Sequence, residues 1–390
     1  MFYHCYLFLS LALLLSACSP TKRPYTQAKA NHSLIDSSLN ILFLGDLAWG
    51  ENYQLRNEQR GRENILTTRG YGYSFQKVLP ILDKAPLIIA NYESTITNLA
   101  NSPLKQVKNY LHKGNPLYVP NWLKKYNIQL LSLANNHALD YGHEGLLQTQ
   151  HYLREAGLQY FGAGLNIAEA ATPYRQTFKL NGKILNLYVL GWMEYRKSYS
   201  QQGKYAFYAD SAKSGVNYWD EERILTQIRN IRRQDSAAFI VAFPHWGKNY
   251  RWRSKKQISI AHAIIAAGAD VLIGHGAHKV QEIEKYRKKW ICYNMGNFVF
   301  NSSGRYQKEE VKPYSIAILL EIKPEYQLGE YRLTLLPIFS DNRITNYQPR
   351  SLSKEEFLDM SHLLMNKSSF QHQEEAFISI DSSQHIIRLK

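Results

Sequence analysis

Five short apolar runs of this chain each lead into a cluster of small polar residues. The runs are Ile41–Leu44, Leu87–Ala90, Leu130–Ala134, Phe239–Phe243 and Val271–Ile273. The clusters that follow them are Gly45-Asp46, Asn91-Tyr92-Glu93, Asn135-Asn136-His137, His245-Trp246-Gly247 and Gly274-His275-Gly276-Ala277-His278. Open α/β sheets bind their ligands outside the carboxyl ends of their strands. The repeated arrangement therefore predicts an α/β fold with a metal site built on strand ends.

Strand-like and helix-like segments alternate from residue 39 onward. The segments expected to be helical include 73–82 (interrupted at Pro80), 143–156, 218–233 and 258–267. Asn181-Gly182 joins two alternating apolar runs, 176–180 and 183–191, and predicts a β-hairpin. Three consecutive strands are expected later in the chain, at 290–294, 314–322 and 331–338. Parallel and antiparallel strands are therefore mixed. The aromatic segment 192–219 has no clear period and is interpreted as a surface excursion, with a lid as the alternative.

The beginning of the chain predicts export. Residues 1–18 contain no Asp, Glu, Lys or Arg, and Tyr6–Ala17 is an apolar run of signal-peptide length. Leu15-Ser16-Ala17-Cys18 resembles the lipobox of bacterial lipoproteins, although no Lys or Arg precedes the apolar run. We therefore expect lipidation at Cys18 and an extracytoplasmic protein anchored to a bacterial membrane, the outer membrane if the cell has one. An ordinary signal peptide or an uncleaved anchor is the alternative.

The remaining chain divides by composition. After the signal peptide (1–18) comes a polar tether (19–38), and residues 39–345 form the expected single domain. Residues 346–390 are expected to be a C-terminal helix and tail, because Ser353 to Glu356 resembles a capping box and the residues beyond Ser368 are polar. Cys292 is the one cysteine outside the signal peptide, so no disulfide within the domain is expected.

The formal net charge of +15 predicts attraction to anionic partners. The Lys and Arg residues are scattered and match no nucleic-acid-binding module, so nucleic acid is not expected. For an exported chain, an anionic envelope polymer or a phosphorylated ligand is the expected partner, together with the membrane that holds the lipid anchor. The alternative is a basic solvated surface without a specific partner.

The polar clusters contain the residue types that bind divalent metal ions. Asp46 and Glu93 would supply hard oxygen ligands at the ends of buried strands. Asn136 adds an amide oxygen, while His137, His245, His275 and His278 add imidazoles. Each residue alone has an ordinary structural role as a cap, turn or buried polar group. Together they come from separate segments that only a folded site would bring into contact.

The order of these motifs resembles the CapA family of capsule and poly-γ-glutamate biosynthesis proteins. The motifs include Ser132 to Gly142 and Tyr293 to Phe298 besides the five clusters, and the resemblance covers roughly residues 40 to 340. The family is related to calcineurin-like metallophosphoesterases. The resemblance implies an α/β fold in which two mixed β-sheets pack face to face with flanking helices, the four-layer sandwich of the metallophosphoesterases.

The resemblance also implies roles for individual residues. One or two divalent ions (Zn, Mn, Fe or Mg) would be bound by Asp46, Glu93, Asn136, His245, His275 and His278, with Glu93 in the bridging position. His137 would act as electrophile or general acid, oriented by Asp140 or Asp46. Asn91, Asn135, Trp246 and Asn297 would contact substrate. The reaction implied is a metal-assisted hydrolysis or acyl transfer.

Three positions depart from the patterns of these relatives. Ala48 stands where the phosphoesterases have a histidine, a ligand that the CapA family also commonly lacks. Gly276-Ala277 and Lys248-Asn249 stand where a His-Pro pair and an acidic residue are typical of the family. Two carboxylates alone would poorly neutralise two divalent ions. Two hypotheses therefore stand: a metal-dependent hydrolase or transferase of the cell envelope, and a non-catalytic envelope factor that binds an anionic polymer. A domain with buried histidines and no ligand is a third.

Overall fold

The computed structural model describes residues 33–35, 38–323, 325–327, 329–368 and 378–390. The predicted signal peptide, Cys18 and most of the predicted tether lie outside the described residues. The last part of the predicted tether differs from expectation, because β1 (Ser33–Ile35) pairs in parallel with β9 (Tyr174–Leu180). The backbone hydrogen bonds of this pairing make residues 33–35 part of a sheet. In the described part of the chain, no helix is long and apolar enough to span a bilayer.

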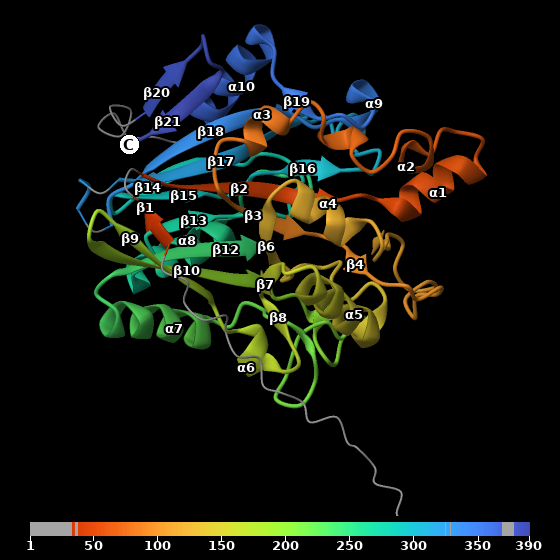
Figure 1. The fold of residues 1–390 in the computed structure, drawn as a ribbon, viewed down its shortest axis with the longest axis horizontal. Helices are drawn as coiled ribbons and strands as arrows, with labels where there is room; N and C mark the ends of the chain where they lie inside the picture. Colours follow the sequence, from red (N-terminus) through yellow and green to blue (C-terminus); the bar gives the residue numbers. More distant parts are fainter. Residues whose placement is uncertain (1–32, 36–37, 324, 328, 369–377) are drawn as a thin grey trace, which may run out of the picture. The chain divides into compact units, whose positions relative to one another are not determined.

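Two large mixed sheets organise the described chain (Figure 1). The first has the strand order β1, β9, β10 (Lys183–Met193), β12 (Ala238–His245), β13 (Val271–Ile273), β15 (Lys289–Cys292) and β14 (Ile283–Tyr286). The second has the order β20 (Ile378–Asp381), β21 (Ile386–Leu389), β18 (Arg332–Phe339), β17 (Tyr314–Ile322), β2 (Leu39–Ala48), β3 (Leu87–Tyr92), β6 (Ile128–Ser132) and β7 (Gln159–Phe161). Two further strands join this sheet, β16 (Asn297–Phe300) beside β2 and β19 (Arg350–Ser351) beside β18. Two small strand pairs are β4 (Thr95–Ile96) with β5 (Lys113–Gly114) and β8 (Ala163–Gly164) with β11 (Gly215–Val216).

The two large sheets pack face to face. Phe43 of β2 and Phe243 of β12 meet across the interface with ring centroids 5.7 Å apart. They belong to one buried cluster that contains side chains from both sheets. Alternate residues of each strand face this interface, as sheet packing requires.

Helices cover the two outer faces. Ile224 and Ile228 of α7 (Glu221–Gln234) and Ile264 of α8 (Lys255–Ala267) pack on the first sheet. Leu123 of α4 (Val119–Lys125) and Leu146 of α5 (Gly142–Glu155) pack on the second. The remaining helical segments are α1 (Glu51–Gln59), α2 (Ile65–Thr68), η1 (Tyr73–Phe75), α3 (Leu79–Leu82), α6 (Ile167–Ala170), η2 (Lys197–Tyr199), α9 (Asn342–Thr345) and α10 (Lys354–Lys367). The expected fold class, two mixed sheets face to face with helices outside, is confirmed.

The C-terminal region differs from the expected loose tail. The predicted capping box is present, with Ser353 and Glu356 opening α10. Beyond it, however, β20 and β21 form a hairpin whose second strand pairs with β18. Ile387 and Leu389 are each 1% exposed in the core between the large sheets. Burial of these two side chains stabilises the hairpin, although the polar residues around them had predicted a loose tail.

Strand β2 changes partner at its polar cluster. It pairs with β17 up to Phe43, whereas Asp46 lies opposite Asn297 of β16. The register against β3 shifts just before Asp46, which marks a β-bulge. A Cβ atom at Gly45 would lie 1.9 Å from the carbonyl oxygen of Gly296, so only glycine allows this close approach. The bulge places Asp46 where β2 leaves one neighbour for the other.

Candidate metal centre

The predicted ligands come together at the carboxyl ends of strands from both sheets. Asp46 lies two residues before the end of β2, and Glu93 follows β3 directly. His245 is the last residue of β12, while His275 and His278 follow β13. An isolated backbone bridge joins His245 to His275. The strand arrows of β2, β10 and β12 point toward the same end of the molecule (Figure 1). The convergence expected from the sequence is therefore present in the structure.

Two sets of ligand atoms are close enough for a metal ion. Asp46, His245 and His275 form one set, and Asp46, Glu93 and His278 form the other. Within each set, the ligand atoms lie within 4.8 Å of one another. Asp46 belongs to both sets, whereas Glu93 belongs to one of them. The family resemblance had implied the bridging position for Glu93.

Several buried ligand atoms have no hydrogen-bond partner. Glu93 Oε1 and His275 Nε2 are both orphaned in this way, and their side chains are fully buried. Buried polar atoms in folded proteins nearly always have a partner. Glu93 belongs to one ligand set and His275 to the other, so each set keeps an open donor atom suited to a divalent cation. The residues present therefore fit a metal ion.

The two carboxylates of the shell titrate in opposite directions. Burial raises the pKa of Asp46, but the imidazoles of His278, His245 and His275 outweigh burial and lower it to about 2. Burial, followed by the charge of Asp46, raises the pKa of Glu93 well above its usual value. Burial also lowers the pKa of His245 and brings that of His275 to about 4. Neutral imidazoles are the form that binds metal.

The four residues expected to contact substrate are buried behind the ligands. Asn91 Nδ2 donates to Asp46 Oδ1 at 2.9 Å, and Asn135 Nδ2 donates to Asn91 Oδ1 at 3.0 Å. Asn297 Oδ1 lies 2.9 Å from His278 Nδ1. Trp246 Nε1 donates to a backbone carbonyl group at 2.7 Å. Partners of this kind orient metal ligands. Direct contact with substrate stays a prediction for all four.

His137 forms a buried network with Asp140. Its Nδ1 lies 2.6 Å from Asp140 Oδ2, so Asp140 is the orienting carboxylate, one of the two that the sequence left open. Lys108 donates to the other oxygen of Asp140 and, at 2.5 Å, to the carbonyl oxygen of Asn136. The ring of His112 stacks on that of His137 with centroids 3.7 Å apart. Burial and the charge of Lys108 lower the pKa of His137 well below its usual value.

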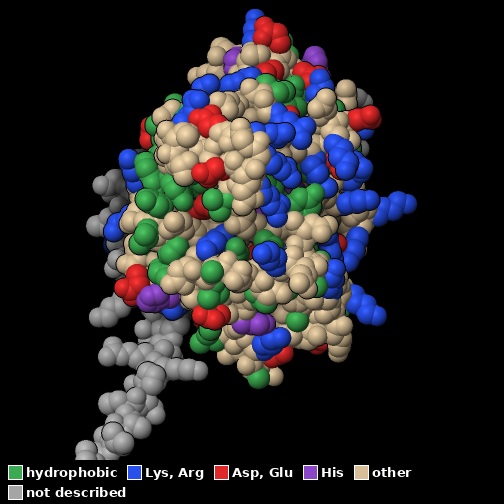
Figure 2. All heavy atoms as spheres, turned by 90° about the vertical axis from the view of Figure 1, so that its right-hand side faces the viewer, with side chains coloured by type: hydrophobic (Ala, Val, Ile, Leu, Met, Phe, Trp, Pro, Cys, Tyr) green, Lys and Arg blue, Asp and Glu red, His purple; other side chains and the backbone are tan. Residues whose placement is uncertain are grey.

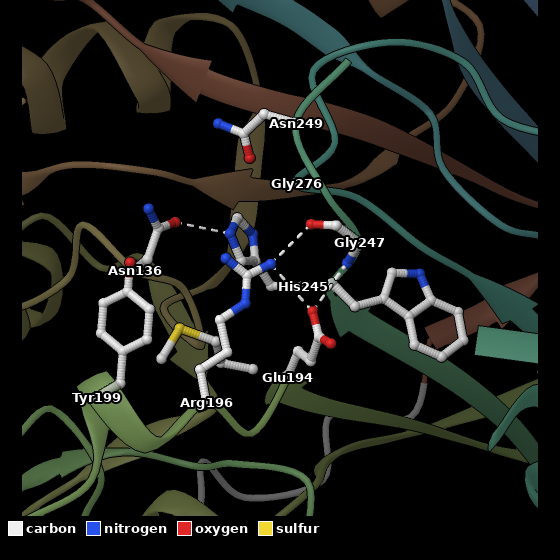
Figure 3. A pocket seen from close by; sticks show the side chains of 10 residues that line it. Asn136, Glu194, Arg196, Tyr199, His245, Gly247, Asn249 and Gly276 are labelled. Carbon is white, nitrogen blue, oxygen red and sulfur yellow. Dashed lines mark hydrogen bonds and ion pairs between the residues drawn. The ribbon is translucent and has the colours of Figure 1, made fainter. Parts of the chain in front are cut away.

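A small hollow on the other side of His245 is closed by β10 and the residues after it (Figure 3). Asn136 Oδ1 lies 2.7 Å from His245 Nε2. Arg196 donates to the Gly247 carbonyl oxygen at 2.8 Å and to Glu194 at 3.0 Å. Glu194 also accepts from the Gly247 backbone N–H at 3.2 Å. A carboxylate therefore does stand beside the His-Trp-Gly cluster, although it comes from the end of β10.

The departure at Gly276 has a steric cause. Gly276 has φ +101°, and a Cβ atom there would lie 2.7 to 2.9 Å from three ring atoms of His245. The imidazole of His245 occupies the space that a larger side chain would need. The third departure, Asn249, lines the cleft described next.

The centre opens into a cleft of about 480 Å³. Asn136, His137 and His278 line it and also belong to the predicted site. Its cationic side chains are Lys108, Arg196, Arg305, Lys308 and Arg343, and no Asp or Glu side chain lines it among the described residues. Aromatic side chains complete the walls, including Tyr199 and Tyr205 from the segment that the sequence placed on the surface. The cleft therefore favours an anionic ligand.

Several residues of this region were missed from the sequence. Lys108 and His112 lie in an irregular stretch whose residues follow neither a strand nor a helix period. Glu194 and Arg196 follow β10 without a motif of their own. Tyr205 Oη lies 3.4 Å from the Val107 carbonyl oxygen, which joins the two unpatterned stretches. The one sequence signal here is the aromatic composition of 192–219.

Comparisons with known proteins identify the family of this chain. The sequence profile of the bacterial capsule synthesis protein PGA_cap matches residues 40–302. The PGA biosynthesis protein CapA of Bacillus subtilis (strain 168) is 30% identical over 267 residues, which cover 68% of this chain and 64% of that protein. The capsule biosynthesis protein CapA of Bacillus anthracis is 26% identical over 298 residues, 75% of this chain and 66% of that protein. The matches thus span slightly less than two thirds of each relative's length. A crystal structure of a phosphatase from Mycoplasma pneumoniae aligns with a TM-score of 0.42 at 12% identity, covering 80% of this chain and 98% of the other.

Proposed function

Because the chain belongs to the bacterial capsule synthesis protein family PGA_cap, we propose that it serves the synthesis or export of an anionic capsule polymer of the poly-γ-glutamate type. In this proposal it carries a metal-dependent hydrolase or transferase site at the strand ends. The names of its Bacillus relatives, a PGA biosynthesis protein and a capsule biosynthesis protein, support the polymer class. The predicted lipid anchor at Cys18 would hold it in the cell envelope.

One observation carries this proposal: the ligand shell opens into a cationic cleft that no Asp or Glu side chain of the described residues lines. Asn136, His137 and His278 belong to both, so an anionic chain in the cleft would reach the shell. Lys308 and Arg343, which form no ion pair within the described chain, would offset the charges of the bound chain. The negative charge of the bound polymer would also help to neutralise divalent ions held by only two carboxylates.

The chemistry follows from the residues of the shell. A bound divalent ion would supply Lewis acidity toward a carbonyl or phosphoryl oxygen. Asp140 holds the Nδ1 side of His137, which leaves Nε2, 3.7 Å from Glu93 Oε1, as the nitrogen that exchanges a proton. Because its pKa is low, His137 begins neutral and would accept a proton from the attacking group before returning one to the leaving group.

A second function is favoured by one feature of the shell. Ala48 is buried at the end of β2 and supplies no nitrogen ligand where the related phosphoesterases would have a histidine. A site that lacks a ligand would hold metal more weakly. The alternative is therefore a non-catalytic factor that binds the anionic polymer during synthesis or export.

Metal content and polymer turnover separate the two functions. The full chain would be purified, its metal measured by mass spectrometry, and polyglutamate cleavage followed with added Zn²⁺, Mn²⁺ or Fe²⁺. An enzyme should hold stoichiometric metal and lose turnover in Asp46→Asn and His275→Ala. If the protein holds no metal and does not cleave polyglutamate, but both variants bind polyglutamate as tightly as the wild type, the non-catalytic function is supported. Failure to bind polyglutamate at all would reject both.

A further inference from the structure

A second hollow continues from the cationic cleft away from the metal centre. Its volume is about 760 Å³. Tyr53, Tyr110, Ser303 and Arg343 line both hollows, so the two are contiguous. A volume of either size accommodates a ligand of several hundred daltons. Together the two hollows form one continuous groove. We call the second hollow, which Arg56, Arg60, Arg62 and Arg343 line, the arginine groove.

The arginine groove is positively charged and its guanidinium groups are free of ion pairs. Arg56 comes from α1, Arg60 and Arg62 from the turn after it, and Arg343 from α9. All four are exposed, and none forms an ion pair with a carboxylate of the described chain. The acidic residue of this lining, Glu63, forms an ion pair with Arg69 at 2.6 Å. Unpaired cations on a concave surface attract an anionic ligand.

Positive charge gathers on the surface at one end of the molecule. Figure 2 faces the end of the molecule that carries α1 and α2, and Lys and Arg side chains gather on the right-hand half of that face with few acidic side chains among them. Arg56 also lies over the ring of Tyr53, 5.9 Å from its centroid. Tyr53 in turn stacks on Tyr110 at the junction of the two hollows. The wall is thus continuous between the cleft and the arginine groove.

From this arrangement we infer that the protein binds a long segment of a linear polyanion, which runs from the cleft through the arginine groove. The inference rests on the proposed function for the polymer, and it adds where the chain lies and that several repeats are bound together. The regular negative charge of a polycarboxylate or a polyphosphate matches cations spread along both hollows. A flat anionic membrane would not enter two hollows, so we favour the linear polymer.

The test compares long and short polyanions. Arg56→Gln, Arg60→Gln and Arg62→Gln are combined in one variant. The matched control combines Lys179→Gln, Arg287→Gln and Lys288→Gln, which removes the same charge from the opposite ends of the strands. Affinities of the full chain for polyglutamate and for inorganic polyphosphate, each long and short, are measured by titration calorimetry at low salt.

We expect the wild type to bind long chains more tightly than short ones. The groove variant should lose about tenfold in affinity for long chains and keep its affinity for short ones, while the control keeps both. The polymer that shows this pattern identifies carboxylate or phosphate as the ligand group. An equal loss of affinity in the control would contradict polymer binding in the arginine groove. An unchanged affinity of the groove variant for long chains would contradict it too.

Two further outcomes distinguish this inference from the proposed function. If the wild type binds long and short chains with equal affinity, polymer binding in the arginine groove is rejected, while polymer binding in the cleft still stands. Binding of neither length overturns both. Loss of binding to vesicles of anionic phospholipid in the groove variant, with long-chain affinity retained, would assign the arginines to a membrane surface instead.

Discussion

Asp46 and Glu93, the two carboxylates of the metal shell, share one hydrogen-bond donor. Asn91 Nδ2 donates to Asp46 Oδ1 at 2.9 Å and to Glu93 Oε2 at 3.3 Å. One amide cannot compensate two buried negative charges. Asp46, whose pKa falls to about 2, stays ionised, whereas Glu93, whose pKa rises well above its usual value, retains a proton when no cation is bound.

Metal binding should therefore release a proton from Glu93. Since the proton and the metal compete for this carboxylate, metal affinity should rise with pH until Glu93 is ionised. Titration calorimetry with Zn²⁺ or Mn²⁺ in buffers of different ionisation enthalpy measures the proton count. Glu93→Gln should bind metal at least about tenfold more weakly and release fewer protons. If this variant releases as many protons on metal binding as the wild type, the released proton comes from a group other than Glu93.

Lys108→Met should destabilise the protein by about 3 to 5 kcal/mol, because it leaves Asp140 buried without its cationic partner. The free energy of unfolding in urea measures this change. Adding Asp140→Asn should restore part of the loss, since the uncompensated charge is then removed. Lys105→Met, at an exposed position of the same stretch, is the control and should change stability by less than about 0.5 kcal/mol. A similar loss in both lysine variants would contradict the role of the ion pair.

Gly276→Ala should weaken metal binding by displacing the ring of His245. Gly182→Ala is a matched control, since Gly182 also has positive φ (+83°) but nothing lies within 4 Å of a Cβ atom there. Both variants should lose about 1 kcal/mol of stability from the backbone strain. Only Gly276→Ala should lower metal affinity, by about tenfold, in a competition assay with a chelator. Equal affinities would show that His245 is not needed for the metal.

Glu51 should make the stability depend on pH. Burial raises its pKa from 4.5 to about 7, while hydrogen bonds from the Asn115 N–H and Tyr71 partly oppose this. A raised folded-state pKa contributes stability that is present below pH 4.5 and lost as pH rises toward 7. Glu51→Gln should therefore gain stability relative to the wild type over this range, by up to about 3 kcal/mol. Urea unfolding at both ends of the range tests this, and a difference that does not change with pH would refute it.

Local signals in the sequence were sufficient for much of the fold. Asn181 and Gly182 both have positive φ in the predicted hairpin between β9 and β10, because their turn needs this conformation. His137 and Asp140 lie in one turn, so their pairing depends only on nearby residues. The ligands converge because the strands before them run parallel within each sheet and the two sheets are packed face to face. Each of these features is determined over a few residues or by a single strand order.

Features that depend on distant segments were not predictable. Lys108 meets Asp140 across 32 residues, and neither residue's neighbours indicate the contact. The expected helix at 73–82 is two short pieces, η1 and α3, with Pro80 in the first turn of α3, where its missing N–H is tolerated. Pairing of β21 with β18 depends on tertiary burial rather than on local propensity.

The change of partner along β2 makes the centre depend on how much of the chain is present. All six predicted metal ligands precede residue 279, but β16, which pairs with β2 at Asp46, comes later. The Asp46 N–H donates to the Gly296 carbonyl oxygen at 3.0 Å, and the Asn301 N–H donates to the Ala48 carbonyl oxygen at 3.0 Å. A nascent chain that ends after His278 has every ligand and the β3 side of β2, but it lacks the β16 backbone that holds Asp46 on the other side. The order of synthesis therefore delays assembly of the metal shell until about three quarters of the chain has emerged.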